Sequence, residues 1–294
     1  MDLATPERAG FVDLGRMRLR VWEWGDEAAP PIVCLHGAYD HGRMWDGMAP
    51  RLAALGHLVV APDLRGHGDS GRLSSGHVFA ATALDVALLA RHLGPPIGLV
   101  GHSFGGGVAV MVAGVWPELI RWVVDLDGLG PADDNFEEED LAAASAKGLA
   151  AAERVRRSSP RRYATREEMV ARRAAVNVRL PKAWVEHLVV HGSEAMEGGF
   201  AWKADPMFSV GLPADFSPAH IEAEHALVQR PVLVLTGGEH DTWSDLSPEQ
   251  VEQRLAHLAG VRHEAVDGAG HYVHLEQPDA VLAAIERFLT EVGP

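Results

Sequence analysis

Ser103 stands between two glycines, Gly101 and Gly105, in the motif Gly-x-Ser-x-Gly. The apolar run at residues 97–100 predicts a buried strand before the motif, and residues 108–115 predict a helix after it. Because glycine has no Cβ, strand and helix can approach closely at a sharp turn, which leaves the serine exposed above the sheet. Such a serine is a candidate nucleophile. The alternative is a glycine-rich turn that only connects two elements.

A serine nucleophile needs a base that takes its proton, and the base needs an acid that orients it. We expect His271 to be the base, because it lies in a glycine-rich loop just after the last predicted strand, residues 262–266. The chain has 16 histidines, so position relative to the strand, and not residue type, selects His271. His274 lies on the same loop. The alternative is that His271 is a surface histidine.

Asp241 is the acid that we expect to orient His271. It follows the strand predicted at residues 231–236, where its carboxylate could accept a hydrogen bond from the Nδ1–H of the histidine. Two other acids remain alternatives for this role. Asp127 follows the preceding predicted strand, and Glu239 shares the loop of Asp241.

Attack of a serine on a carbonyl creates an oxyanion, which needs two N–H donors. Each donor lowers the activation free energy by about 3 kcal/mol. One expected donor is the amide of Phe104, at the start of the helix after the serine. The other is the amide of Ala38, on the loop after the strand predicted at residues 32–35. We expect His36 to brace that loop and not to carry protons.

The elements that must position these residues alternate between strand and helix, which predicts an α/β fold with a parallel sheet covered on both faces. An opening hairpin is expected to turn at Gly15, and Ser247 is expected to be the N-cap of a helix that begins with Pro248. The strands are expected at residues 11–14, 17–24, 32–35, 58–61, 97–100, 122–127, 231–236 and 262–266, and the main helices at 44–55, 78–93, 108–115, 247–258 and from 278 onward.

This alternation stops near residue 130. Residues 131–229 are rich in Ala, Glu and Arg and are expected to form mainly helices broken by loops. An insertion of this length is too long for a simple connection between strand and helix. We therefore predict a core formed by residues 1–130 and 230–294, and a helical cap, residues 131–229, that covers the active edge of the sheet. The likeliest helices of the cap are at residues 141–155, 166–176 and 183–191.

Composition narrows the classes of function. The chain has 294 residues and a net charge of −15, which argues against binding to nucleic acid or to an anionic membrane and makes it a poor match to a strongly anionic substrate. It has no apolar run long enough to span a bilayer and no visible signal peptide. Its single cysteine, Cys34, is expected to pack inside a strand. A cytoplasmic location is the expectation.

No cofactor is expected. The glycines around Ser103 do not form the dinucleotide-binding pattern G-x-G-x-x-G. A zinc site on His271 and His274 lacks a clear third ligand, so no metal is expected.

The expected partner is a small ester or acyl substrate bound by a monomer or homodimer. Tyr39 and Tyr272 are candidate pocket residues. Four further apolar residues could line an acyl pocket or form the core of the cap: Phe200, Trp202, Met207 and Phe208.

Taken together, several motifs resemble the α/β-hydrolase fold superfamily, in order through nearly all of the predicted core. These stretches are Leu35-His36-Gly37, Asp63-Leu64-Arg65-Gly66-His67-Gly68-Asp69-Ser70, Gly101-His102-Ser103-Phe104-Gly105-Gly106, Gly238-Glu239-His240-Asp241 and Gly270-His271. The run at residues 197–203 resembles serine hydrolase-like proteins. The resemblance implies a mostly parallel, eight-stranded sheet with helices on both faces and an inserted, mainly helical cap. It also implies a catalytic triad at Ser103, Asp241 and His271, with an oxyanion hole at Ala38 and Phe104 and the Asp63–Ser70 loop as scaffold.

Members of the superfamily that cleave carbon–halogen bonds or epoxides have an aspartate where this chain has Ser103. A serine instead favours acyl transfer: attack on a carbonyl, formation of an acyl-enzyme and its hydrolysis by water. The predicted activity is therefore that of a serine hydrolase that cleaves carboxylic esters. The same residues could serve a carbon–carbon bond hydrolase, thioesterase, lactonase or perhydrolase. The non-enzyme alternative is a receptor-like, ligand-binding protein with the same fold.

Overall fold

A computed structural model describes residues 3–72, 79–132, 141–210, 217–244 and 246–293. Its centre is an eight-stranded sheet in the order β1-β2-β4-β3-β5-β6-β9-β10, in which β1 pairs antiparallel with β2 and β2 with β4, while the other neighbours are parallel. The strands are β1 (Arg8–Asp13), β2 (Arg18–Trp24), β3 (Pro31–Leu35), β4 (Leu58–Pro62), β5 (Ile97–His102), β6 (Ile120–Leu126), β9 (Val232–Gly237) and β10 (Arg262–Val266). The predicted mostly parallel sheet of eight strands is confirmed.

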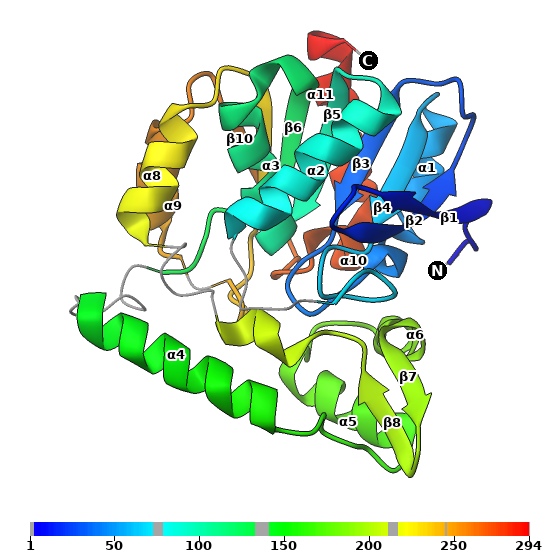
Figure 1. Ribbon diagram of the computed structural model, residues 1–294. Coiled ribbons are helices and arrows are strands. Elements are labelled where there is room, and N and C mark those ends of the chain that lie inside the picture. The colour runs from blue at the N-terminus through cyan, green and yellow to red at the C-terminus, as the bar shows by residue number, and fades with distance from the viewer. Residues whose placement is uncertain (1–2, 73–78, 133–140, 211–216, 245, 294) are drawn as a thin grey trace.

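Helices cover both faces of this sheet, because successive side chains of a buried strand point to opposite faces and both faces are apolar. On β3, for example, Val33 and Leu35 join one hydrophobic cluster and Ile32 and Cys34 the other. The first cluster includes α2 (Phe79–Leu93) and α3 (Phe104–Val115), and the second includes α1 (Ala49–Ala54), α10 (Val273–Glu276) and α11 (Pro278–Val292). Figure 1 shows α2 and α3 in front of the sheet and α11 behind it.

Local sequence signals account for several helix boundaries. Ser247 forms a capping box with Gln250 and opens α9 (Pro248–Ala256), as its sequence predicts. The helix expected at residues 44–55 is instead split into a short 3-10 helix, η1 (Gly42–Trp45), and α1. Pro50 lies in the first turn of α1. It has no N–H to continue a preceding helix, which is a physical reason for the break.

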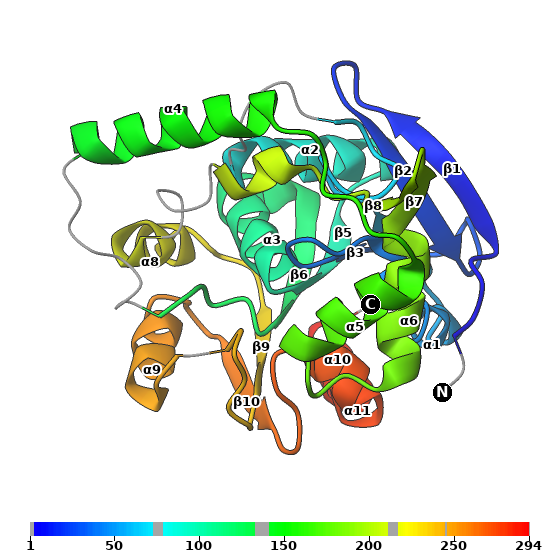
Figure 2. The same ribbon diagram turned by 90° about the horizontal axis from the view of Figure 1, so that it is seen from below.

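Between β6 and β9, the described part of residues 131–229, which we call the inserted segment, contains α4 (Leu141–Arg157), α5 (Arg166–Val176), α6 (Lys182–Gly192), the 3-10 helix η4 (Pro206–Val210) and α8 (Pro218–Ala226). It also contains an antiparallel hairpin, β7 (Ser193–Met196) with β8 (Gly199–Trp202), which the sequence analysis did not predict. Gly198 and Gly199 both have positive φ at its turn. Figures 1 and 2 show α5, α6 and this hairpin grouped together, whereas α8 lies beside α9.

In the part of the chain that the structure describes, no helix combines the length and the apolar character needed to cross a membrane.

Candidate active site

Ser103 lies at the sharp turn between β5 and α3, which we call the elbow, with φ of 52° and ψ of −120°. The two flanking glycines are required by close backbone contacts. A Cβ on Gly101 would lie 2.2 Å from the carbonyl oxygen of Gly105, and a Cβ on Gly105 would lie 2.5 Å from the carbonyl oxygen of Leu35. The turn therefore has the strained geometry that presents a serine above a sheet edge.

Positive φ among non-glycine residues marks the same region. Within the described ranges, Tyr39, Ser103 and Asp127 are the non-glycine residues with φ in the left-handed region. Tyr39 and Ser103 line one cavity, and Asp127 contacts a histidine of that cavity. Strained backbone of this kind gathers at functional sites, where the surrounding structure holds it in place.

His271 is paired with Asp127. Its Nδ1 lies 2.7 Å from Oδ2 of the carboxylate, and the two side chains are only 10% and 6% exposed. The other carboxylate oxygen, Oδ1, accepts a hydrogen bond of 3.1 Å from the N–H of Gly237 at the end of β9. The aspartate is thus held from two sides, and it fixes the orientation of the imidazole ring.

The expectation that Asp241 accepts the Nδ1–H of His271 is wrong in this structure. The Oδ1 of Asp241 instead accepts the N–H of Trp243 within a local turn, and its Oδ2 accepts the backbone N–H of His271 at 3.4 Å. Asp127 reaches the ring because β6, which it follows, lies between β5 and β9. Glu239, the third candidate, is exposed.

Two buried imidazoles, His102 and His274, lie near His271, and a third, His36, lies near His102. The Nε2–H of His102 donates to the carbonyl of His271 at 2.9 Å, and the His274 ring lies 4.8 Å from the His102 ring. Burial lowers the pKa of His102 well below its ordinary value and that of His274 to about 3. Burial also lowers the pKa of His36 to about 4. These rings are neutral near pH 7, so they place no positive charge beside His271.

His36 braces its loop, as expected. Its Nδ1–H donates to the carbonyl of Gly37 at 2.7 Å, and its Nε2 accepts the N–H of Leu64 at 2.8 Å. Ala38, one of the two expected oxyanion donors, follows on this loop and lines the cavity that contains Ser103. Phe104, the other expected donor, is the first residue of α3.

Ser103 and His271 line the same cavity, which has a volume of about 270 Å³. Tyr39 and Tyr272 line it as well, which confirms both as pocket residues. The complete lining is Gly37, Ala38, Tyr39, Asp40, His102, Ser103, Arg172, Arg173, Val176, Asn177, Trp202, Trp243, His271 and Tyr272. Four of these residues belong to α5 or β8 of the inserted segment, so the segment forms part of the wall.

Trp202 is the only one of the four apolar cap candidates in this lining. Phe208 is fully buried and packs edge-to-face on Phe104 and Tyr39, and Met207 is buried beside it. A second cavity of about 570 Å³ shares Tyr39, Arg173 and Trp202 with the first. These three residues therefore lie between the two cavities.

Sequence reasoning missed Arg173, which extends from α5 to two core loops. Its Nη2 contacts the carboxylate of Asp40 and donates to the hydroxyl of Tyr272 at 3.3 Å. That hydroxyl in turn donates to Oδ2 of Asp40 at 3.1 Å. Because these contacts join residues that are 133 and 99 positions apart, no local signal in the sequence could reveal them.

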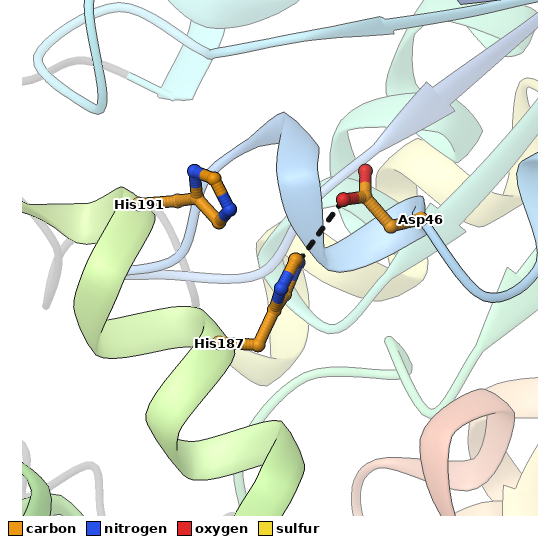
Figure 3. A group of neighbouring side chains, drawn as sticks. All are labelled: Asp46, His187 and His191. Atoms are coloured by element: carbon orange, nitrogen blue, oxygen red, sulfur yellow. Dashed lines mark ion pairs between the residues drawn. The ribbon is translucent and has the colours of Figure 1, made fainter. Parts of the chain in front are cut away.

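In the described residues, one group of three side chains has the spacing of a metal site: Asp46, His187 and His191 (Figure 3). His187 and His191 lie one turn apart on α6, and Nε2 of His187 lies 3.1 Å from the Asp46 carboxylate. Arg43, however, already supplies the positive charge that a metal ion would bring to Asp46. Its Nε lies 2.8 Å from both oxygens of Asp46, and its Nη1 lies 3.3 Å from Nδ1 of His191. These residues are therefore satisfied without an ion.

The fold and the site have the features of an α/β hydrolase. In agreement, the alpha/beta hydrolase family matches residues 32–284, and this chain belongs to that family.

Several relatives align over most of the chain. It is 28% identical to the sn-1-specific diacylglycerol lipase ABHD11 of Mus musculus, over 90% of this chain and 82% of the lipase. It is 29% identical to the 2-(acetamidomethylene)succinate hydrolase of Mesorhizobium japonicum, over 95% of this chain and 94% of that protein. Among solved structures, the thioesterase domain from the curacin biosynthetic pathway aligns with a TM-score of 0.84 and 22% identity, covering 95% of this chain and 99% of that domain.

Proposed function

We propose that the protein is a serine hydrolase that cleaves carboxylic esters of small molecules through an acyl-enzyme intermediate. The observation that carries this proposal is that a strained serine, Ser103, and His271, which is hydrogen-bonded to Asp127, line one cavity. Relatives named lipase and esterase support the ester class.

Ser103 is the nucleophile and His271 is the base. The Nε2 of His271 takes the hydroxyl proton while the serine oxygen attacks the carbonyl carbon, and the carbonyl oxygen becomes an oxyanion. The amides of Ala38 and Phe104 are the proposed donors to this oxyanion. Asp127 stabilises the imidazolium that forms, because its carboxylate faces Nδ1.

Collapse of the tetrahedral intermediate breaks the ester bond, and His271 returns its proton to the leaving alcohol. Water then loses a proton to His271 and attacks the acyl carbon, which releases the acid and restores the Ser103 hydroxyl. The inserted segment acts as the cap in this proposal, because its residues complete the wall of the cavity.

The test compares wild type with Ser103→Ala on a panel of esters, thioesters and lactones, together with covalent labelling by a fluorophosphonate. We expect wild type to hydrolyse an activated short-chain ester and to be labelled at Ser103. The alanine variant should lose turnover by roughly 10⁴- to 10⁶-fold and should not be labelled.

Ser158→Ala is the matched control, because Ser158 is an exposed serine directly after α4 that does not line the cavity of Ser103 and whose hydroxyl donates to the Val155 carbonyl at 2.9 Å. It should retain labelling and turnover. Full turnover by Ser103→Ala would refute the nucleophile assignment. A folded wild type that is neither labelled nor active would favour the receptor-like alternative.

A further inference from the structure

The guanidinium of Arg173 lies beside the reacting residues and is almost completely buried. Its side chain is 10% exposed and that of its partner Asp40 is 1% exposed. Arg173 lines the cavity that contains Ser103 and also the larger cavity next to it. A ligand that binds at Ser103 therefore lies close to a buried positive charge.

One donor of this guanidinium has no acceptor. The Nε–H of Arg173 is buried and makes no hydrogen bond with any residue that the structure describes. Asp40 does not satisfy it, because Oδ1 of Asp40 faces Nη2 and Oδ2 accepts the Tyr272 hydroxyl. A buried N–H without an acceptor is unfavourable, so an acceptor supplied by a ligand would stabilise this arrangement.

Arg173 keeps its charge in this position. Burial alone disfavours the charged form, but the Asp40 carboxylate and the Tyr272 oxygen outweigh burial and raise the pKa of Arg173. Arg173 is paired with Asp40, and Arg172, which also lines the cavity, is paired with Glu168 on the same helix.

We propose that the substrate carries a carboxylate, and that an oxygen of this carboxylate accepts the Nε–H of Arg173 while Ser103 attacks the ester carbonyl of the same molecule. This inference rests on the proposed function of Ser103. A carboxylate is favoured over a neutral acceptor, because hydrogen bonds between charged partners are roughly twice as strong as those between neutral ones. The cavity volume of about 270 Å³ favours a short spacer between carboxylate and ester.

The experiment uses pairs of esters that differ only in charge. The first pair is the monomethyl ester of glutaric acid and methyl glutaramate, in which an amide replaces the carboxylate of the acyl half. The second pair is the acetate ester of γ-hydroxybutyrate and its amide, with the charge in the alcohol half. We expect wild type to favour the acid over the amide in kcat/KM by about tenfold or more in at least one pair. Equal values in both pairs would overturn the proposal.

The variant that tests the contact is Arg173→Met combined with Asp40→Asn. Both charges are removed together, because Arg173→Met alone would leave the Asp40 carboxylate buried and unpaired. We expect the ratio of kcat/KM for acid over amide to fall to within about threefold of unity. A purely structural role of Arg173 would lower both rates and leave their ratio unchanged, and that result would also overturn the proposal.

Arg157→Met is the matched control, because Arg157 is an exposed arginine of α4 whose partner is Glu153. It should keep the ratio of wild type. Fluorophosphonate labelling distinguishes a failure of the proposed function from a failure of the carboxylate proposal. An unlabelled wild type that hydrolyses neither member of a pair contradicts the proposed function. A labelled wild type with equal rates for acid and amide contradicts only the proposal that the substrate carries a carboxylate.

Discussion

The Nδ1 of His271 lies 2.7 Å from Oδ2 of Asp127. The other carboxylate oxygen of Asp127 accepts a hydrogen bond of 3.1 Å from the N–H of Gly237. The backbone of Asp127 has φ of 56°, in the left-handed region. A strained residue that is fixed by two partners is pre-organised for its role, and its removal should affect the reaction more than the fold.

We therefore expect Asp127→Asn to lower kcat for the best ester by roughly 10⁴-fold, because an amide in this position does not hold the required tautomer of His271. Asp241→Asn should lower kcat by less than about tenfold, because that side chain contacts only backbone N–H groups. The measurement is steady-state kinetics of both variants on the same ester. A larger loss in Asp241→Asn than in Asp127→Asn would show that the acid is Asp241.

The glycines of the elbow should be intolerant of any side chain. In Gly105→Ala, the added methyl would lie 2.5 Å from the carbonyl oxygen of Leu35, which is backbone and has little room to move. We expect a loss of about 1–3 kcal/mol in the free energy of unfolding and a displaced Ser103. Urea unfolding and fluorophosphonate labelling measure the two effects.

Gly148→Ala is the control for this substitution, since an added Cβ there meets no atom within 4 Å. Gly148 lies within α4, so alanine should raise stability by up to about 1 kcal/mol. Similar effects of Gly105→Ala and Gly148→Ala would show that the elbow is not tightly constrained.

His274 should make the protein sensitive to acid. Burial lowers its pKa from an ordinary value of 6.5 to about 3, so between these values only the unfolded chain takes up the proton. The stability that depends on neutral His274 is present above pH 6.5 and is lost as the pH falls toward 3. In His274→Leu, the slope of unfolding free energy against pH in this window should decrease by up to about 1.4 kcal/mol per pH unit.

Urea unfolding at a series of pH values measures that slope. His92→Leu, at an exposed position of α2, is the matched control and should leave the slope as in wild type. An unchanged slope in His274→Leu would mean that His274 takes up its proton without unfolding.

Asp125 should have the opposite pH dependence. Burial, and next the charge of Asp127, raise its pKa well above the ordinary value of 3.8. The folded state therefore favours the protonated acid, and its contribution to stability is complete below pH 3.8 and is lost as the pH rises. Asp125→Asn has no such loss, so it should be more stable than wild type near pH 7, with a smaller difference near pH 4. Thermal unfolding at both pH values checks this, and an equal change at both would contradict it.

Local sequence patterns were sufficient to predict the order of the strands along the chain, the elbow at Ser103 and the loop of His271. These features follow from local patterns: apolar runs of strand length, glycines on both sides of a serine, and capping residues such as Ser247. The family resemblance rests on the same local motifs, and the family match confirms it. The hairpin β7–β8 was missed because the composition of residues 131–229 favours helices.

The packing of distant segments determines which acid contacts His271 and which residues of the inserted segment reach the cavity. Asp127 and Asp241 both follow a strand of the sheet, and the sequence favoured Asp241. The spatial order of β5, β6 and β9 instead brings Asp127 to the imidazole. The contacts of Arg173 with Asp40 and Tyr272 join residues that are 133 and 99 positions apart in the chain. Such contacts depend on how distant segments pack against each other, and no local pattern of residues encodes that packing.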